Sequence, residues 1–184
     1  MSIARVGLAA VLAGGISVGI AILGQRWIEP PSGVESLTAE RTVAQLQTLP
    51  ELRLPDLQGQ EVSSQGWAGK VVVINYWASW CPPCLREMPV FIRAQESHGD
   101  LVQVVGIAVD RPDDVRTFVA DYPVNYPILI ADPEAVAISK RLGNRVEGLP
   151  FTVIFDRRGR RVFSRTGEVT AAELDAEIAA LIDG

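Results

Sequence analysis

The sequence predicts one domain of the α/β class, built on a central sheet flanked by helices, and three patterns carry this prediction. Residues 71–77 (VVVINYW) form a β-branched, nearly continuous apolar run, typical of a strand covered on both faces. Residues 85–97 have the composition of a helix and precede a second apolar run at 101–109, which together make a strand–helix–strand pattern. Residues 171–182 predict a last helix, because Thr170 and Glu173 match a capping box.

The N-terminal region predicts a membrane segment and a tether ahead of the domain. Val6 to Gly24 contains 19 residues without a charge. At about 1.5 Å per helical residue this stretch reaches about 28 Å, close to the hydrocarbon thickness of a bilayer. We therefore expect a signal-anchor or transmembrane helix at 1–24, a tether at 25–50 and the folded domain at 51–184. A cleaved signal peptide remains the alternative, and both place the domain across the membrane.

The remaining elements follow in order along the domain. Alternating leucines before a Gln58-Gly59 turn predict a short N-terminal hairpin, and Asp156 to Gly159 predicts a turn between two late strands. Pro133 suits the first turn of a helix. The patterns place the hairpin at 52–62, a helix at 113–121, an extra strand at 126–130, a helix at 133–142, a strand at 151–155 and a returning strand at 161–165.

Cys81 and Cys84 are the only cysteines of the chain, and their spacing predicts a redox pair. A bond between them closes almost no loop, so it would add little stability. Structural zinc needs four ligands, which this pair and the one histidine, His98, do not supply, and we predict no metal and no cofactor. The strand-then-helix pattern puts Cys81 at a helix N-terminus, where the pKa of a thiol is lowered. Cys84, one turn further, then acts as the resolving thiol.

Pro82 and Pro83, between the cysteines, have no N–H to donate. The first backbone donor for the Cys81 sulfur is therefore expected at Cys84. With one stabilising contact missing, we predict that the pKa of Cys81 is only moderately lowered. That property suits a reductant better than a strong oxidant, because strong oxidants stabilise their reduced thiolate.

The run from Asn75 to Pro89 (NYWASWCPPCLREMP) resembles the membrane-anchored thioredoxin-like reductases of the TlpA, ResA and CcmG type. Further matches are GKV at 69–71, GLPFT at 148–152 and DRRG at 156–159, and the insert through Tyr126-Pro127 is most similar to the TlpA group. The resemblance covers about residues 50 to 184. It implies a thioredoxin-like fold with a central mixed sheet, an N-terminal hairpin and an insert.

The resemblance also implies roles for single residues. Pro150 matches the family's cis-proline, which exposes the backbone of the preceding residue, here Leu149, for pairing with substrate. Trp80 matches a tryptophan that lines the site. Glu87 matches a glutamate that accepts a proton from the buried thiol, although a solvated carboxylate on the helix surface is an equal alternative. Asn75 stands where cytoplasmic thioredoxins carry a buried aspartate.

These observations predict a disulfide reductase acting on disulfide-containing extracytoplasmic proteins, in cytochrome c or copper-oxidase maturation, with electrons from a transmembrane thiol donor. We expect one pass through the bacterial cytoplasmic membrane at residues 6–24, with the catalytic domain in the periplasm. The net charge of −5 argues against nucleic-acid binding.

Two other functions stay open. A copper-binding protein of thioredoxin fold would usually carry a wider cysteine spacing and a distal histidine. A peroxiredoxin would need a Pro-x-x-x-Thr-x-x-Cys setting, which does not precede Cys81.

Overall fold

The computed structural model describes residues 45–182, so the predicted membrane segment at 1–24 and most of the tether at 25–50 lie outside the described residues. No helix within residues 45–182 combines the length and the apolar character that a membrane span requires. The elements, in chain order, are β1 (Arg53–Pro55), β2 (Glu61–Ser63), the 3-10 helix η1 (Ser64–Trp67), β3 (Val71–Trp77), α2 (Pro82–His98), β4 (Val102–Ala108), α3 (Pro112–Asp121), β5 (Ile128–Ile130), α4 (Pro133–Arg141), β6 (Phe151–Phe155), β7 (Arg161–Thr166) and α5 (Ala171–Ile182).

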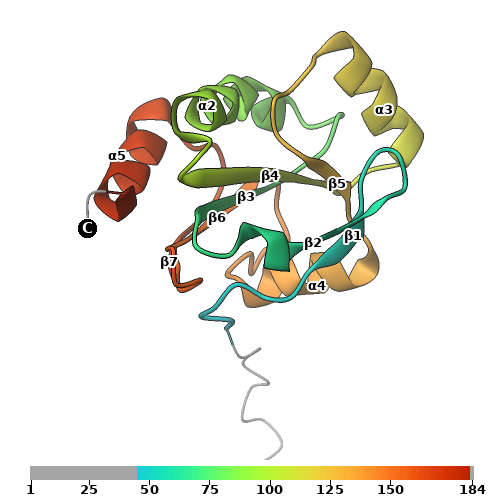
Figure 1. The fold of residues 1–184 in the computed structure, drawn as a ribbon. Coiled ribbons are helices and arrows are strands. Elements are labelled where there is room, and N and C mark those ends of the chain that lie inside the picture. The colour runs from blue at the N-terminus through green and yellow to red at the C-terminus, as the bar shows by residue number, and fades with distance from the viewer. Residues whose placement is uncertain (1–44, 183–184) are drawn as a thin grey trace, which may run out of the picture. The chain divides into compact units, whose positions relative to one another are not determined.

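The main sheet has five strands in the order β5-β4-β3-β6-β7 (Figure 1). Strands β3, β4 and β5 run parallel, whereas β6 is antiparallel to β3 and β7 is antiparallel to β6. The sheet is therefore mixed, and the thioredoxin-like α/β fold is confirmed. The predicted N-terminal hairpin is also present, because β1 pairs antiparallel with β2. Gly59 in its turn has φ +80°, a backbone conformation that favours glycine.

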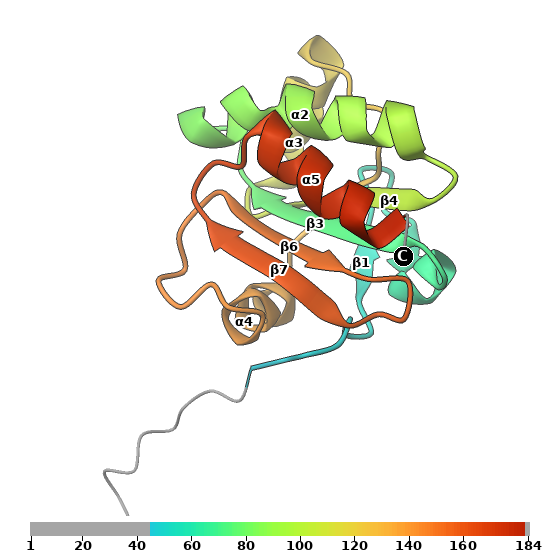
Figure 2. The same cartoon turned by 90° about the vertical axis from the view of Figure 1, so that its left-hand side faces the viewer.

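The central strand β3 is buried on both faces, as its continuous apolar run predicts. Successive side chains of a strand point to opposite faces. Val71, Val73 and Trp77 pack with residues of α2, α3 and α5, whereas Val72, Ile74 and Tyr76 pack with residues of α4 and the β1–β2 hairpin. Figure 2 shows α2 and α5 above the sheet and α4 below it.

The observed boundaries differ little from the predicted ones. Helix α2 begins at Pro82 and not at residue 85, because a proline is well tolerated in the first turn, where no intrahelical donor is needed. Strand β5 is only 3 residues long. The short helix η1 was not predicted; Ser63 caps it by accepting a hydrogen bond from the Gln65 N–H.

Residues 45–50, which fall in the predicted tether, already pair with the folded domain. The Leu46 N–H donates to the Arg141 carbonyl at 2.8 Å, and the Leu49 N–H donates to the Gly159 carbonyl at 2.7 Å. The chain therefore joins the domain beside the end of α4 and the turn between β6 and β7.

Candidate active site

The two cysteines lie at the connection between β3 and α2. Cys81 follows Trp77, the last residue of β3, by four positions. Cys81 is the N-cap of α2, and Cys84 lies inside its first turn. The two residues are joined by a disulfide bond with their Cα atoms 5.3 Å apart. Cys81 is 4% exposed and Cys84 is fully buried, so Cys81 is the sulfur nearer to solvent.

Within residues 45–182, the Cys81 sulfur accepts one hydrogen bond, from the Cys84 N–H at 3.4 Å. Pro82 and Pro83 occupy the first two positions of the helix and have no N–H. Within the described residues, the first backbone donor to this sulfur is therefore at Cys84, as the sequence predicts.

Glu87 lies one turn beyond Cys84 and is only 2% exposed, so the alternative of a solvated surface carboxylate is wrong. Its Oε1 accepts a 2.7 Å hydrogen bond from Asn75 Nδ2, and its Oε2 accepts a 2.9 Å bond from the Val169 N–H. Burial nevertheless raises the pKa of Glu87 to about 7, and the nearby charge of Glu168 acts in the same direction, whereas the two hydrogen bonds oppose it. Glu87 can therefore gain or lose a proton near neutral pH.

Asn75 links β3 to both α2 and β6 through hydrogen bonds of its side chain. Its side chain comes from the α2 face of β3, and Nδ2 also lies 3.2 Å from Thr152 Oγ1 on β6. Asn75 is buried and neutral, so it stabilises the Glu87 carboxylate without adding a second buried charge.

The loop before Cys81 is held by a residue that the sequence did not single out. Asp110, just after β4, accepts hydrogen bonds from the Ser79 N–H at 2.9 Å and the Ser79 hydroxyl at 2.6 Å. Because β3 and β4 are parallel neighbours, their carboxyl ends meet at one edge of the sheet. The sequence signal that could have identified Asp110 is its position directly after the predicted apolar strand at 101–109.

A groove of about 370 Å³ opens beside Cys81 and is lined mostly by apolar side chains. Trp80, which is 66% exposed, and Leu149 both border it, so the structure brings these two predicted residues to the cysteine. The bond between Leu149 and Pro150 is cis, as the resemblance implies. The full lining is Tyr76, Trp80, Cys81, Pro82, Pro83, Val109, Val136, Ser139, Asn144, Glu147 and Leu149.

Asn144 shapes the segment that leads to Leu149, and sequence reasoning missed it. Its Nδ2 donates to the Gly148 carbonyl and its Oδ1 accepts from the Gly148 N–H, both at 3.0 Å. Tyr76, in the floor of the groove, has a buried hydroxyl without a hydrogen-bond partner within the described residues. A polar group that enters the groove could satisfy it.

No group of three or more His, Cys, Asp and Glu side chains within residues 45–182 is placed to hold a metal ion. The site brings together two bonded sulfurs, one buried carboxyl group and an apolar groove.

The Redoxin family model matches residues 44–179 of this chain. The thioredoxin-like protein YneN of Bacillus subtilis strain 168 is 32% identical over 136 residues, which cover 72% of this chain and 77% of that protein. The thiol-disulfide oxidoreductase ResA of Geobacillus kaustophilus strain HTA426 is 29% identical over 143 residues, which cover 77% of this chain and 80% of that protein.

Solved structures share the fold. A thiol:disulfide interchange protein of the thioredoxin family from Chlorobium tepidum superposes with a TM-score of 0.69 at 25% identity, covering 76% of this chain and 98% of that one. A thioredoxin-related protein from Neisseria meningitidis serogroup B has a TM-score of 0.63 at 32% identity, covering 71% and 99%.

Proposed function

This chain belongs to the Redoxin family and is a thiol–disulfide oxidoreductase of the ResA, CcmG and TlpA type, and on that premise we propose that Cys81 and Cys84 reduce disulfide bonds of extracytoplasmic proteins. The observation that carries the proposal is the disulfide at the N-terminus of α2, with Cys81 beside an apolar groove. Both redox states need only these two side chains.

The reaction proceeds by two exchanges. In the dithiol form, the Cys81 thiolate attacks one sulfur of the substrate disulfide, the substrate S–S bond breaks, and the first substrate thiolate leaves and takes up a proton. The Cys84 thiolate then attacks the Cys81 sulfur of the mixed disulfide and releases the second substrate thiolate. Two electrons have passed to the substrate, and the enzyme is left with the Cys81–Cys84 disulfide.

Glu87 is proposed as the group that receives the proton of Cys84 before the second exchange. Both residues belong to the buried face of α2, one turn apart. A carboxyl group with a pKa of about 7 is matched to proton transfer at neutral pH.

The apolar groove beside Cys81 is evidence that the substrate is a protein. Trp80 and Leu149 line the groove together with Cys81 and offer apolar contact there, and Leu149 directly precedes the cis-proline. We propose that the substrates are proteins of cytochrome c or copper-oxidase maturation, and that a transmembrane thiol donor returns the enzyme to its dithiol form. Anchoring through residues 6–24 and a periplasmic location belong to the same proposal, supported by the uncharged N-terminal stretch.

The test is a mixed-disulfide trap in bacterial cells. Cys84→Ser removes the resolving thiol, so substrates should remain bonded to Cys81 and be identified by mass spectrometry after non-reducing electrophoresis. Cys81→Ser, which keeps Cys84, is the matched control and should trap far less. Trapping of cytoplasmic proteins alone, or equal trapping by both variants, would overturn the proposal.

Two further assays address the other functions. Turnover of peroxide in place of disulfides would favour a peroxiredoxin. Tight copper binding by the dithiol form, without disulfide reduction, would favour copper delivery.

A further inference from the structure

The turn between β6 and β7 concentrates positive charge. Arg157, Arg158, Arg160 and Arg161 fill four of five consecutive positions in a chain of net charge −5. Asp156 is the acidic residue of this turn: its side chain accepts from the N–H groups of Arg158 and Arg160, and it pairs with the Arg160 guanidinium at 2.7 Å. The turn therefore has a defined shape and keeps an excess of positive charge.

Two of these side chains make little contact with the described part of the fold. Arg157 and Arg158 are both exposed. Arg157 donates one hydrogen bond, to the Ile182 carbonyl at 3.1 Å, and the Arg158 guanidinium has no hydrogen-bond partner within residues 45–182. The Arg158 guanidinium is thus exposed to an external anion, and the exposed Arg157 guanidinium has further N–H groups beyond the one that it donates to Ile182.

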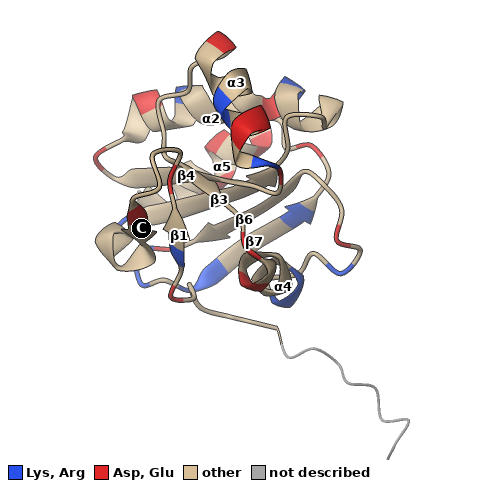
Figure 3. Ribbon diagram, turned by 90° about the vertical axis from the view of Figure 1, so that its right-hand side faces the viewer, with Lys and Arg blue, Asp and Glu red and all other residues tan. Residues whose placement is uncertain are grey.

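The turn lies at the end of the sheet opposite to the redox pair. Strand β6 is antiparallel to β3, so Phe155 pairs with Val72 and Phe151 pairs with Tyr76. With 7 residues in β3 and about 3.3 Å per residue, the two ends lie about 20 Å apart. The chain from the N-terminus also joins the domain here, because Arg161 N–H donates to the Gln47 carbonyl at 2.8 Å. Figure 3 shows basic segments at the start of β7 and on α4, near the point where the chain joins.

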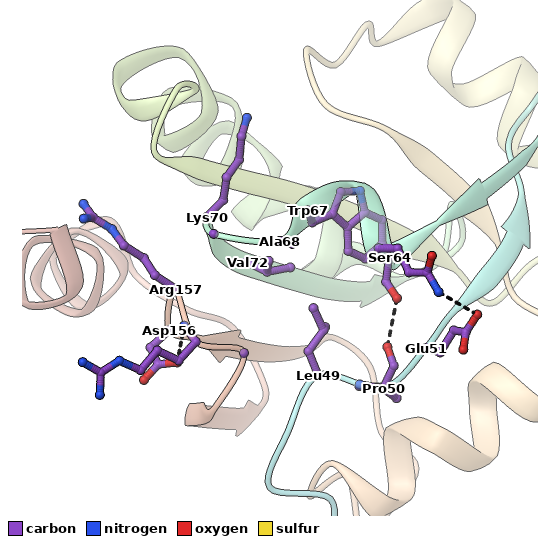
Figure 4. A pocket seen from close by; sticks show the side chains of 14 residues that line it. Leu49, Pro50, Glu51, Ser64, Trp67, Ala68, Lys70, Val72, Asp156 and Arg157 are labelled. Atoms are coloured by element: carbon purple, nitrogen blue, oxygen red, sulfur yellow. Dashed lines mark hydrogen bonds between the residues drawn. The ribbon is translucent and has the colours of Figure 1, made fainter.

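A hollow of about 350 Å³ adjoins the turn. Leu49, Trp67 and Val72 give it apolar walls, and Arg157 extends outward from its edge (Figure 4). Glu51 also lines the hollow, and the Lys70 ammonium at its edge donates to the Gly99 carbonyl at 3.1 Å. Basic side chains around an apolar recess match the two parts of a phospholipid, its phosphate and its glycerol and acyl region. The apolar walls favour a lipid over a nucleic acid.

We propose that the β6–β7 turn and this hollow form a surface that binds the head groups of anionic phospholipids and directs the redox pair away from the bilayer. The inference rests on the proposed anchoring of the chain through residues 6–24, and the described chain enters the domain at this end, where Leu49 and Gln47 pair with the turn. Each basic side chain near an anionic surface strengthens association by about fivefold.

The test uses the full chain in nanodiscs of phosphatidylcholine alone or of equimolar phosphatidylcholine and phosphatidylglycerol. Phenylglyoxal labelling, quantified by mass spectrometry, reports the accessibility of each arginine. We expect labelling of Arg157 and Arg158 to slow at least about fivefold in the anionic discs, and to recover in about 1 M salt, where charges are screened within about 3 Å. Arg93 and Arg111, exposed on other parts of the domain, should label equally in both discs.

A charge-matched pair of variants supplies the control. The double variant Arg157→Gln/Arg158→Gln should weaken surface association by about 30-fold. Labelling of Arg160, which is exposed in the same turn and slowed by anionic discs in the unaltered protein, should then be equal in both discs. Arg93→Gln/Arg111→Gln carries the same change of charge and should keep the slower labelling of Arg160 in anionic discs. Disulfide reduction, measured in the same discs, should be unchanged in both.

Three results would overturn the inference. One is equal labelling of the turn in both discs, and another is protection by an added oligonucleotide but not by phosphatidylglycerol. The third is failure of the chain to co-purify with either disc, which would overturn both the proposed anchoring and the proposed lipid-binding surface. The proposed redox function is tested separately, by the disulfide-reduction assay.

Discussion

Asn75 and Glu87, one on β3 and one on α2, are joined by a buried hydrogen bond of 2.7 Å, and Glu87 lies one helical turn beyond Cys84. The contact places a titratable carboxyl group in the apolar interior of the domain. Burial raises the pKa of Glu87 from an ordinary value of 4.5 to about 7, and the hydrogen bond from Asn75 opposes this rise without cancelling it.

Glu87 should make the folded state less stable as the pH rises. Between the unfolded pKa of 4.5 and the folded pKa of about 7, the folded protein binds more protons than the unfolded chain. The free energy of unfolding therefore falls by up to about 3 kcal/mol across this window. Urea unfolding of the oxidised protein at pH 4.5 and 8 measures it. Glu87→Gln should lose this slope and Glu96→Gln, on the exposed side of the same helix, should keep it. An unchanged slope in Glu87→Gln would contradict the prediction.

Glu87 should also control the second exchange of the reaction. If it accepts the Cys84 proton, Glu87→Gln slows release of the mixed disulfide by about 100-fold, while formation of that disulfide by Cys81 changes much less. Stopped-flow single turnovers with a chromogenic disulfide resolve the two steps. The release rate of the unaltered protein should rise through a pKa of about 7. A purely structural role would leave that pH profile in place in the variant.

Pro82→Ala should lower the pKa of the Cys81 thiol. The substitution adds a backbone N–H at the first position of α2, and a hydrogen bond to a charged group contributes about 1.5 kcal/mol, which lowers a pKa by about 1. The reduction potential should become more oxidising. The absorbance of the thiolate at about 240 nm follows the titration of Cys81. Pro112→Ala makes the same change at α3, where no cysteine lies, and should leave Cys81 unaffected. A pKa that stays or rises in Pro82→Ala would refute the argument.

Asp110→Ala should loosen the loop that carries Trp80 and Cys81. It leaves the Ser79 N–H without its acceptor, at a cost of about 1 to 3 kcal/mol in the free energy of unfolding. We expect slower disulfide reduction as well, because Cys81 is less firmly positioned. Urea unfolding and turnover measure the two effects. Asp121→Ala, at the exposed end of α3, is the control and should match the unaltered protein in both.

Trp80→Ala should weaken substrate binding without weakening the fold. Trp80 is 66% exposed, so little core packing is lost, but it borders the groove beside Cys81. We expect KM for a protein disulfide to rise by about fivefold, equivalent to about 1 kcal/mol, with kcat nearly unchanged. Val162→Ala removes an exposed apolar side chain near the other end of the sheet and should leave KM unaltered. A fall in kcat alone would argue against a role in binding.

Much of the fold could be predicted because its patterns are local. The apolar run of β3, the capping box of α5 and the glycine turn of the hairpin each depend on residues close in sequence, and all three form as expected. The disulfide between Cys81 and Cys84 and the backbone donor at Cys84 also follow from a spacing of three residues.

Contacts between distant segments could not be predicted in the same way. Asp110 meets Ser79 across 31 positions, and Glu87 meets the Val169 N–H across 82. The local sequence can place Asp110 after a strand and Glu87 on a helix, but it does not identify the partner of either carboxylate, since strand order and helix packing set which distant groups meet.

The sequence by itself therefore determined the chemistry of this protein: two cysteines at the start of a helix, two prolines that withhold donors from the first of them, and an uncharged stretch at the N-terminus. Only the tertiary structure decided that Glu87 is buried and titrates near neutral pH, that Asp110 holds the Cys81 loop, and that the arginine turn lies at the end of the sheet opposite to the redox pair. Burial and long-range pairing arise when separate elements pack together, so they are properties of the folded chain.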